Sequence, residues 1–178
     1  MSRQYWGETL SWMTSDGTAV ANTTTETIIF PDVTIPANYM QDGRILRLHA
    51  FGKLSTTATP TIIFALRWGG VSGTLLATTE AITTASGSAN TAWGLTALIQ
   101  TRSNGSTGSL FVMGQVQVNL TSSTATEGVF GVSGFDAPAV VSSLNLAADT
   151  ALSITADWSA QDAANTLTGH IYTIESLN

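Results

Sequence analysis

Apolar and polar residues alternate with a period of two along most of the chain after about residue 24. The alternation is clearest over residues 110–120. One face of this segment carries Leu110, Val112, Val116, Val118 and Leu120, and the other carries Phe111, Met113, Gln115, Gln117 and Asn119. This pattern is typical of a strand with one buried face. No segment has a helical period longer than two turns, so the sequence predicts an all-β protein.

The alternating segments predict eight main strands separated by clusters of turn residues. They cover residues 24–30, 44–54, 61–68, 91–101, 110–120, 140–146, 151–158 and 167–176, with residues 75–79 as a short extra strand. Residues 80–90 and 121–137 are expected to form long loops. This arrangement favours an eight-stranded antiparallel jelly-roll sandwich over residues 23–178. An immunoglobulin-like sandwich, which usually needs only about 100 residues, is the alternative.

Residues 1–22 have no sustained period but are rich in aromatic side chains. The segment contains two of the five tryptophans and carries Tyr5, Trp6, Trp12 and Met13 among polar residues and glycine. Exposed apolar groups tend to mark contacts. We therefore interpret residues 1–22 as an extended N-terminal arm, which docks on its own domain or on a partner.

The charge distribution excludes several function classes. Charged residues make up 10% of the chain, against roughly 25% in an ordinary soluble domain, and the net charge is −6. All the lysines and arginines lie within residues 1–102, where equal numbers of acids balance them, so residues 103–178 carry the whole net charge. This pattern does not favour a nucleic-acid partner, because such proteins usually carry a basic patch. No apolar run approaches the roughly 18 residues of a membrane span.

The N-terminal sequence lacks the basic segment and apolar core of a secretory signal. We therefore expect synthesis in a cytoplasm, followed by retention there or release as part of a larger assembly. The chain has no cysteine, so neither disulfides nor thiolate metal sites can form.

The sequence contains no recognisable catalytic motif. His49 and His170 are the two histidines, and neither a Gly-x-Ser-x-Gly elbow nor a His-Glu-x-x-His pair is present. Two separated histidines are too few for a zinc site. Asp149, Asp157 and Asp162 offer carboxylates for calcium, but their spacing matches no loop motif. We expect no catalytic residue, metal or cofactor.

The surface composition favours assembly. The chain has a single lysine, Lys53, whereas monomeric β proteins commonly protect exposed strand edges with lysine. Burial in a closed oligomer replaces that protection. Phe51, Phe111 and Met113 point outward by alternation, so we predict that they lie in a contact between subunits.

A carbohydrate-binding module is a competing hypothesis, because exposed aromatic side chains can stack on sugar rings. Trp68, Trp93 and Trp158 are in phase with apolar neighbours and are predicted to lie in the core. The aromatic residues that remain for stacking on a sugar are Tyr39, Tyr172 and those of the arm.

Several segments resemble those of small virion proteins of tailed bacteriophages, in particular jelly-roll capsid decoration (cement) proteins. They are DGRILRL at 42–48, FALRWGG at 64–70, LIQTRSNG at 98–105, the strand at 151–158 and NTLTGH at 165–170. The resemblance implies a homotrimer on the capsid surface that binds the major capsid protein at threefold or quasi-threefold positions, with its arm reaching across the shell. A tail-fibre or receptor- or carbohydrate-binding head domain is the alternative.

Overall fold

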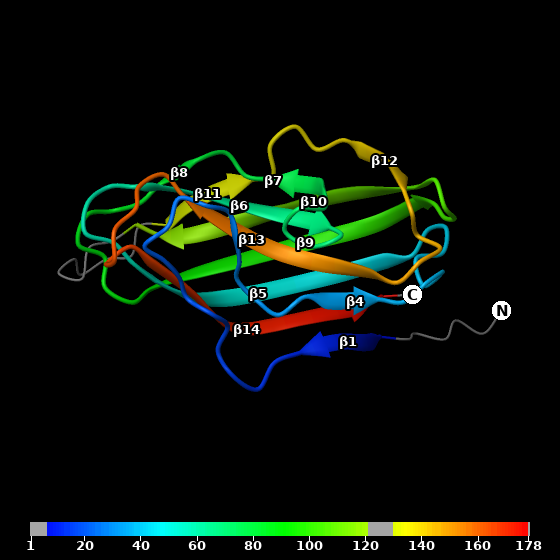
Figure 1. The fold of residues 1–178 in the computed structure, drawn as a ribbon, viewed down its shortest axis with the longest axis horizontal. Coiled ribbons are helices and arrows are strands. Elements are labelled where there is room, and N and C mark those ends of the chain that lie inside the picture. Colours follow the sequence, from blue (N-terminus) through cyan, green and yellow to red (C-terminus); the bar gives the residue numbers. More distant parts are fainter. Residues whose placement is uncertain (1–6, 121–129, 178) are drawn as a thin grey trace.

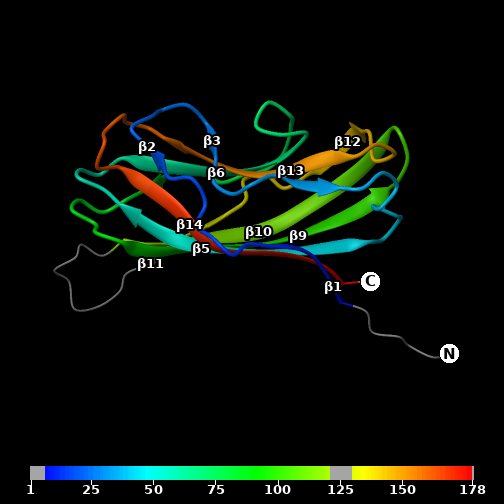
Figure 2. The same ribbon diagram turned by 60° about the horizontal axis from the view of Figure 1, so that its bottom comes forward.

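The chain forms two antiparallel sheets that pack face to face (Figures 1 and 2) in a computed structural model, which describes residues 7–120 and 130–177. These residues contain no helix, and therefore none that is long and apolar enough to cross a membrane. The prediction of an all-β, jelly-roll-like sandwich is confirmed.

Within the described part of the chain, the larger sheet has eight strands. Its order is β1 (Glu8–Trp12), β14 (Thr166–Ser176), β5 (Ile45–Ser55), β9 (Thr91–Ser103), β10 (Gly108–Asn119) and β11 (Phe130–Gly134). The short strand β2 (Val20–Ala21) pairs with β14, and β12 (Val140–Leu144) pairs with β10. The long strands β14, β5, β9 and β10 lie side by side, so their outward side chains form one continuous surface.

The smaller sheet has six strands. Its order is β3 (Thr27–Ile28), β13 (Thr150–Trp158), β6 (Thr61–Trp68) and β7 (Thr74–Thr78), with β4 (Val33–Ile35) beside β13 and β8 (Ile82–Thr83) beside β6. The chain crosses between the sheets from β2 to β3, from β4 to β5, from β5 to β6, from β8 to β9, and on both sides of β13. Such crossings are characteristic of two-sheet sandwiches of the jelly-roll kind.

The core lies between the sheets and follows the predicted alternation. Trp68, Trp93 and Trp158 are 5%, 2% and 1% exposed, which confirms their predicted burial. The indole Nε1 of Trp158 donates a hydrogen bond to the carbonyl of Val20 (3.1 Å), so this side chain also holds the N-terminal segment. Full burial of one large apolar side chain contributes about 1.5–3 kcal/mol to folding.

The regular structure differs from the sequence prediction in several places. β8 lies within residues 80–90, which we expected to form a loop, and only Thr27–Ile28 of the predicted strand 24–30 form β3. Residues 130–134, which we expected to lie within a loop, form β11 and pair with Gln115–Asn119 of β10. The segment FGVSG contains two glycines and so has low β-propensity. It forms a strand because β10 offers a free edge with which it pairs. Within the predicted arm, β1 and β2 both pair with β14. The division of the chain at residues 22 and 23 stays a prediction.

A β-bulge in β14 changes the phase of its alternation. Gly169 pairs with Gly52 and Ile171 pairs with Phe51, which leaves His170 as the extra residue. The Nδ1 atom of His170 lies 2.7 Å from the carboxylate of Asp16. Beyond the bulge, Ile171 points outward and is 58% exposed, while Tyr172 points inward and is 3% exposed.

Candidate binding surface on the larger sheet

The outward side chains of β14, β5, β9 and β10 form a surface that we call the outer face. Antiparallel pairing places them in rows, because residues opposite one another point to the same side of a sheet. One row is Glu175, Arg47, Leu98 and Met113; the next is Thr173, His49, Thr96 and Gln115; a third is Ile171, Phe51, Gly94 and Gln117. Phe111, Gln100, Lys53 and Arg102 complete the outer face.

The outer face exposes large apolar side chains. Phe51, Leu98, Met113 and Ile171 are 43%, 45%, 54% and 58% exposed. A shallow hollow of about 240 Å³ is lined by Ile45, Leu98, Gln100, Arg102, Phe111 and Met113. Apolar groups gathered on one flat face, rather than scattered singly, are characteristic of a contact surface.

Local packing holds Phe51 in place on the outer face. Its ring lies above Gly94, where a Cβ atom would be only 2.9 Å from Phe51 Cδ1. The His49 ring is nearly parallel to it, with centroids 6.3 Å apart and an interplanar angle of 9°. The absence of a side chain at Gly94 therefore lets an aromatic ring lie flat against the sheet, which reduces the conformational entropy that Phe51 loses on binding.

The charges of the outer face are mostly basic, although the whole chain is acidic. Arg47 forms an ion pair with Glu175, with its Nε atom 3.0 Å from Oε2. The guanidinium of Arg102 lies 5.0 Å from the centroid of the Phe111 ring. Among the described residues, neither Arg102 nor Lys53 forms a salt bridge.

The structure brings the three predicted interface residues onto this one surface. Phe51, Phe111 and Met113 all lie on the outer face, and their role in subunit contact stays a prediction. Leu98 and Ile171 were not predicted. Leu98 lies between the buried residues Ala97 and Ile99. Alternation in the sequence therefore places it on the outward face. The outward orientation of Ile171 depends on the bulge in β14, so alternation in the sequence does not predict it.

The predicted arm residues do not share one location. Trp12 lies opposite Thr173 and is 66% exposed, so it extends the outer face at the β1 edge. Met13 instead packs against the core. Tyr5 and Trp6 lie outside the described residues. Contact of these residues with a capsid stays a prediction.

The two tyrosines named as sugar-stacking candidates have other partners. Tyr172 is buried and stacks on Phe30 with centroids 5.0 Å apart, and its burial raises its pKa to about 12. The Tyr39 hydroxyl donates a hydrogen bond to Glu8 (2.8 Å), and the Arg44 guanidinium lies 4.3 Å from the Tyr39 ring centroid. The prediction is therefore wrong for Tyr172, whose ring faces the core.

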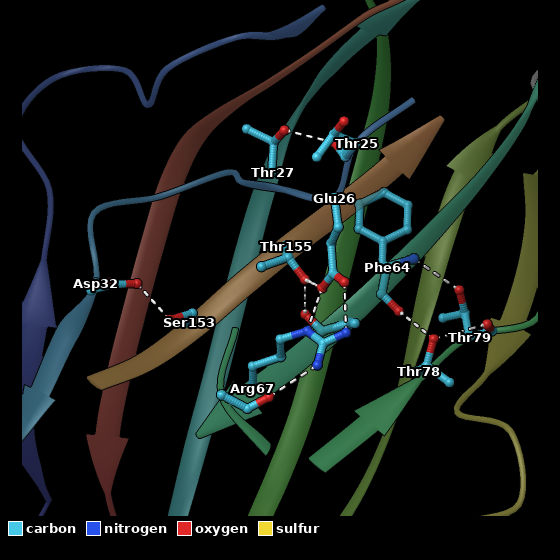
Figure 3. A network of polar contacts seen from close by, with 12 residues as sticks. Thr25, Glu26, Thr27, Asp32, Phe64, Arg67, Thr78, Thr79, Ser153 and Thr155 are labelled. Carbon is cyan, nitrogen blue, oxygen red and sulfur yellow. Dashed lines mark hydrogen bonds and ion pairs between the residues drawn. The ribbon is translucent and has the colours of Figure 1, made fainter. Parts of the chain in front are cut away.

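The outward face of the smaller sheet is more polar, because the side chains of Glu26 and Asp32 cover part of it. Glu26 accepts hydrogen bonds from Nε and Nη2 of Arg67 (2.6 Å each) and from the hydroxyl of Thr155 (Figure 3). Asp32 accepts one from Ser153, two residues along β13. Ser153 and Thr155 are therefore buried although they point away from the core. This polar cluster fixes the N-terminal segment to the sheet.

The hydrogen bonds from Arg67 lower the pKa of Glu26, in opposition to its partial burial. A carboxyl group with a lowered pKa stabilises the folded state above its unfolded pKa, and this contribution is lost as the pH falls through the folded pKa. The Glu26–Arg67 pair is 26% and 21% exposed and is therefore only partly screened by water. Acidification is thus expected to loosen residues 26–32.

Asp157 lies on the same face of β13 as Thr155, but its pKa is raised where that of Glu26 is lowered. Desolvation, followed by the charge of Glu26, raises its pKa, and its buried Oδ1 atom has no hydrogen-bond partner. We expect Asp157→Asn to increase the free energy of unfolding at pH 7 by about 1 kcal/mol, because the variant carries no charge into this site. The gain shrinks as the pH falls through the raised pKa of Asp157, because the wild-type group then also becomes neutral.

Urea unfolding of both proteins at pH 7 and pH 4 measures this difference. A variant less stable than wild type at pH 7, or a gain that is equal at the two pH values, contradicts the assignment.

The described residues offer no candidate metal site. They contain no group of three or more His, Cys, Asp or Glu side chains placed to hold a metal ion. Asp149 accepts a hydrogen bond from the Ala37 amide, and Asp162 accepts one from the Ala164 amide. His49 lies 3.5 Å from the hydroxyl of Thr96.

No protein-family model matches the chain, and no curated protein matches it. Among solved structures, one described as the CBM2 module of the evolved Dit of Lactobacillus casei BL23 phage J-1 resembles it, with 10% sequence identity and a TM-score of 0.39. The alignment covers 97% of each chain.

Proposed function

We propose that this chain is a non-catalytic structural protein of a phage particle, which acts by binding other protein subunits through its outer face. The observation that carries the proposal is the group of exposed apolar side chains Phe51, Leu98, Met113 and Ile171 on one sheet surface. Protein interfaces are enriched in aromatic residues, methionine and arginine and depleted in lysine and glutamate. The outer face carries two phenylalanines, one methionine and two arginines, beside Lys53 and Glu175.

The resemblance to capsid decoration proteins favours a particular form of this function. In that form the chain is a homotrimer on the capsid surface, contacts the major capsid protein and stabilises the assembled head. The low charge of the chain supports the proposal, because a subunit that is covered by its neighbours needs few charged groups for solubility. The exposed indole of Trp12 supplies an aromatic anchor for the capsid contact.

A receptor- or carbohydrate-binding head domain is the second candidate, and Trp12 is also the observation that favours it. The indole is 66% exposed, and the row that continues from it across the sheet is Thr173, His49, Thr96 and Gln115. An aromatic ring beside hydrogen-bonding side chains suits a ligand with one apolar and one polar side, such as a sugar ring.

Binding of the full-length chain to empty expanded capsids of its phage, to host cells and to host glycans separates the two candidates. We expect capsid binding, a higher melting temperature of the decorated capsid, and at least a tenfold weaker capsid affinity for Trp12→Ser, since buried tryptophan anchors commonly dominate interfaces. Thr9→Ala, at an exposed position of the same strand, is the control and is expected to bind like wild type.

Absence of capsid binding overturns the decoration function. If Trp12→Ser instead loses retention on cells or glycans, the receptor-binding candidate replaces it. Deletion of residues 1–22 is a poorer test, because it removes β1, β2 and the Val20 carbonyl that accepts the hydrogen bond of Trp158.

A further inference from the structure

The turn between β9 and β10 contains the one asparagine of the chain that is followed by glycine, Asn104–Gly105. Strand β9 ends at Ser103 and β10 begins at Gly108, so the pair opens the connection between them. Gly105 has a φ of +92°, a backbone conformation that glycine adopts without the steric cost of a side chain. The turn therefore favours glycine at this position, and Asn104 has a neighbour without a side chain.

An asparagine followed by glycine can react with its own backbone. The glycine nitrogen attacks the side-chain carbonyl carbon of asparagine, a new C–N bond forms, and the bond from that carbon to the amide nitrogen breaks. The amide nitrogen leaves as ammonia and takes the proton of the glycine nitrogen, which leaves a succinimide ring. Water then opens the ring at either carbonyl and gives aspartate or isoaspartate. The net reaction consumes one water, releases one ammonia and needs no other reagent.

The residue after each of the other internal asparagines obstructs this ring closure. Asparagine is thermolabile in general, but a side chain on the next residue crowds the attacking nitrogen. Threonine follows Asn22, Asn90 and Asn165, tyrosine follows Asn38, and leucine follows Asn119 and Asn145. The reaction is therefore expected to be selective for Asn104.

The surroundings of Asn104 leave the reacting atoms accessible. Its side chain is exposed, so water reaches it. Nδ2 of Asn104 donates a hydrogen bond to Oε1 of Gln41 (3.0 Å), and the backbone amide of Asn104 donates one to Oδ1 of Asp42 (2.7 Å). Within the described residues, the amide of Gly105 donates no hydrogen bond. The attack of this nitrogen on Cγ of Asn104 therefore breaks no existing contact of the nitrogen.

The carbonyl of Gly105 joins the turn to a segment distant in sequence. It accepts hydrogen bonds from the amides of Leu146 (2.9 Å) and Gly108 (3.3 Å). Leu146 is buried, and its own carbonyl accepts a hydrogen bond from the amide of Asn38 (2.9 Å). A Cβ atom on Gly108 would lie only 2.6 Å from Cδ1 of Leu146, so the two segments are closely packed. The position of the Gly105 carbonyl thus holds the segment that follows β12.

We propose that Asn104 converts spontaneously to isoaspartate and aspartate in the folded protein, and that this conversion releases Leu146 from the turn. The inference goes beyond the proposed function and does not depend on it. Isoaspartate, the larger product of ring opening, adds a methylene group to the main chain immediately before Gly105 and so displaces its carbonyl from the Leu146 amide. Aspartate, the smaller product, adds a carboxylate close to Asp42, which repels it.

Ageing of the folded full chain, followed by mass spectrometry of its chymotryptic peptides, tests the conversion. Heavy-oxygen water labels each converted residue, and a methyltransferase specific for isoaspartate identifies the main product. We expect conversion at position 104 to be at least tenfold faster than at any other internal asparagine, which corresponds to a barrier lower by about 1.4 kcal/mol. We also expect it to accelerate from pH 6 to pH 8, because the Gly105 nitrogen attacks after losing its proton.

Two outcomes of the ageing experiment overturn the proposal. One is conversion at position 104 in urea but not in the folded chain, because the turn then protects the asparagine. The other is conversion at similar rates at position 104 and at the remaining asparagines, because the glycine and the turn then have no influence.

Hydrogen exchange at the Leu146 amide tests the structural consequence. We expect this amide to lose protection in proportion to the fraction of chains converted. The amide of Ile29, which donates to the carbonyl of Ile154 (2.9 Å) in the smaller sheet, is expected to keep its protection. Unchanged protection of Leu146 after conversion overturns the proposed release. Loss of protection at both amides overturns it as well, because the effect is then general unfolding.

Asn104→Gln is the matched control. It keeps an amide side chain, but the attack of the Gly105 nitrogen would have to close a larger ring, which is much slower. Its exchange pattern before ageing is expected to match that of wild type, which shows that it is folded. We expect neither conversion at position 104 nor loss of Leu146 protection on ageing. If Leu146 loses protection in this variant as fast as in wild type, the link between the two events is wrong.

Discussion

Replacement of Trp68 by alanine is expected to lower the free energy of unfolding by about 3–5 kcal/mol. Trp68 is the last residue of β6, is 5% exposed and pairs with Leu152 of β13 and Thr74 of β7. Its removal leaves a cavity between two sheets whose strands cannot close together without breaking their hydrogen bonds. The loss therefore combines lost burial with a cavity term. Urea unfolding monitored by far-UV circular dichroism measures it.

Trp68→Phe is the matched control for this substitution. The indole Nε1 of Trp68 is buried without a hydrogen-bond partner, and an unsatisfied donor costs about 1–3 kcal/mol. Phenylalanine keeps most of the apolar volume and removes that donor, so we expect its stability to lie within about 1 kcal/mol of wild type. A near-neutral Trp68→Ala would show that this side chain is not in the core.

Substitution of Gly52 by alanine is expected to have the second-largest effect, a loss of about 3 kcal/mol. Gly52 lies in the middle of β5 and is buried between Gly169 of β14 and Trp93 of β9. A Cβ atom there would overlap the backbone carbonyl of Thr168 and would lie 2.7 Å from Nε1 of Trp93. Because a backbone atom cannot rotate away as a side chain can, the strands themselves must separate.

The same indole strengthens the expectation for Gly52. Trp93 Nε1 donates a hydrogen bond to the Thr168 carbonyl (3.3 Å), so an added methyl group would also break this contact between β9 and β14. Gly7→Ala is the control, because no atom lies within 4 Å of its Cβ position. Thermal unfolding of both variants measures the difference. Equal melting temperatures for Gly52→Ala and Gly7→Ala would contradict the packing described for β5.

The strands that could be predicted from sequence are those whose alternation is complete within one segment. β6 begins and ends at the predicted residues 61 and 68. In β10, Leu110, Val112, Val116 and Val118 are buried as predicted. β1 lies in a segment without a sustained period, and β11 contains two glycines. Neither could be predicted locally, because their pairing comes from β14 and β10.

The candidate surface was predictable in part for the same reason. Phe51, Phe111 and Met113 follow from alternation alone, and Leu98 obeys the same rule. Ile171 does not, because the bulge at His170 shifts the phase of β14 by one residue, and a bulge is a property of two paired strands.

The sequence by itself determined the class of fold and which side chains point to each face of a strand. Successive side chains of a strand point to opposite faces, so this information lies in consecutive residues. The tertiary structure alone decided which outward faces stay exposed. Thr155 and Phe51 both point away from the core, yet Thr155 is buried beneath Glu26 while Phe51 is 43% exposed. Whether an outward side chain is covered depends on where a segment distant in sequence packs. The alternation within one strand contains no information about that packing.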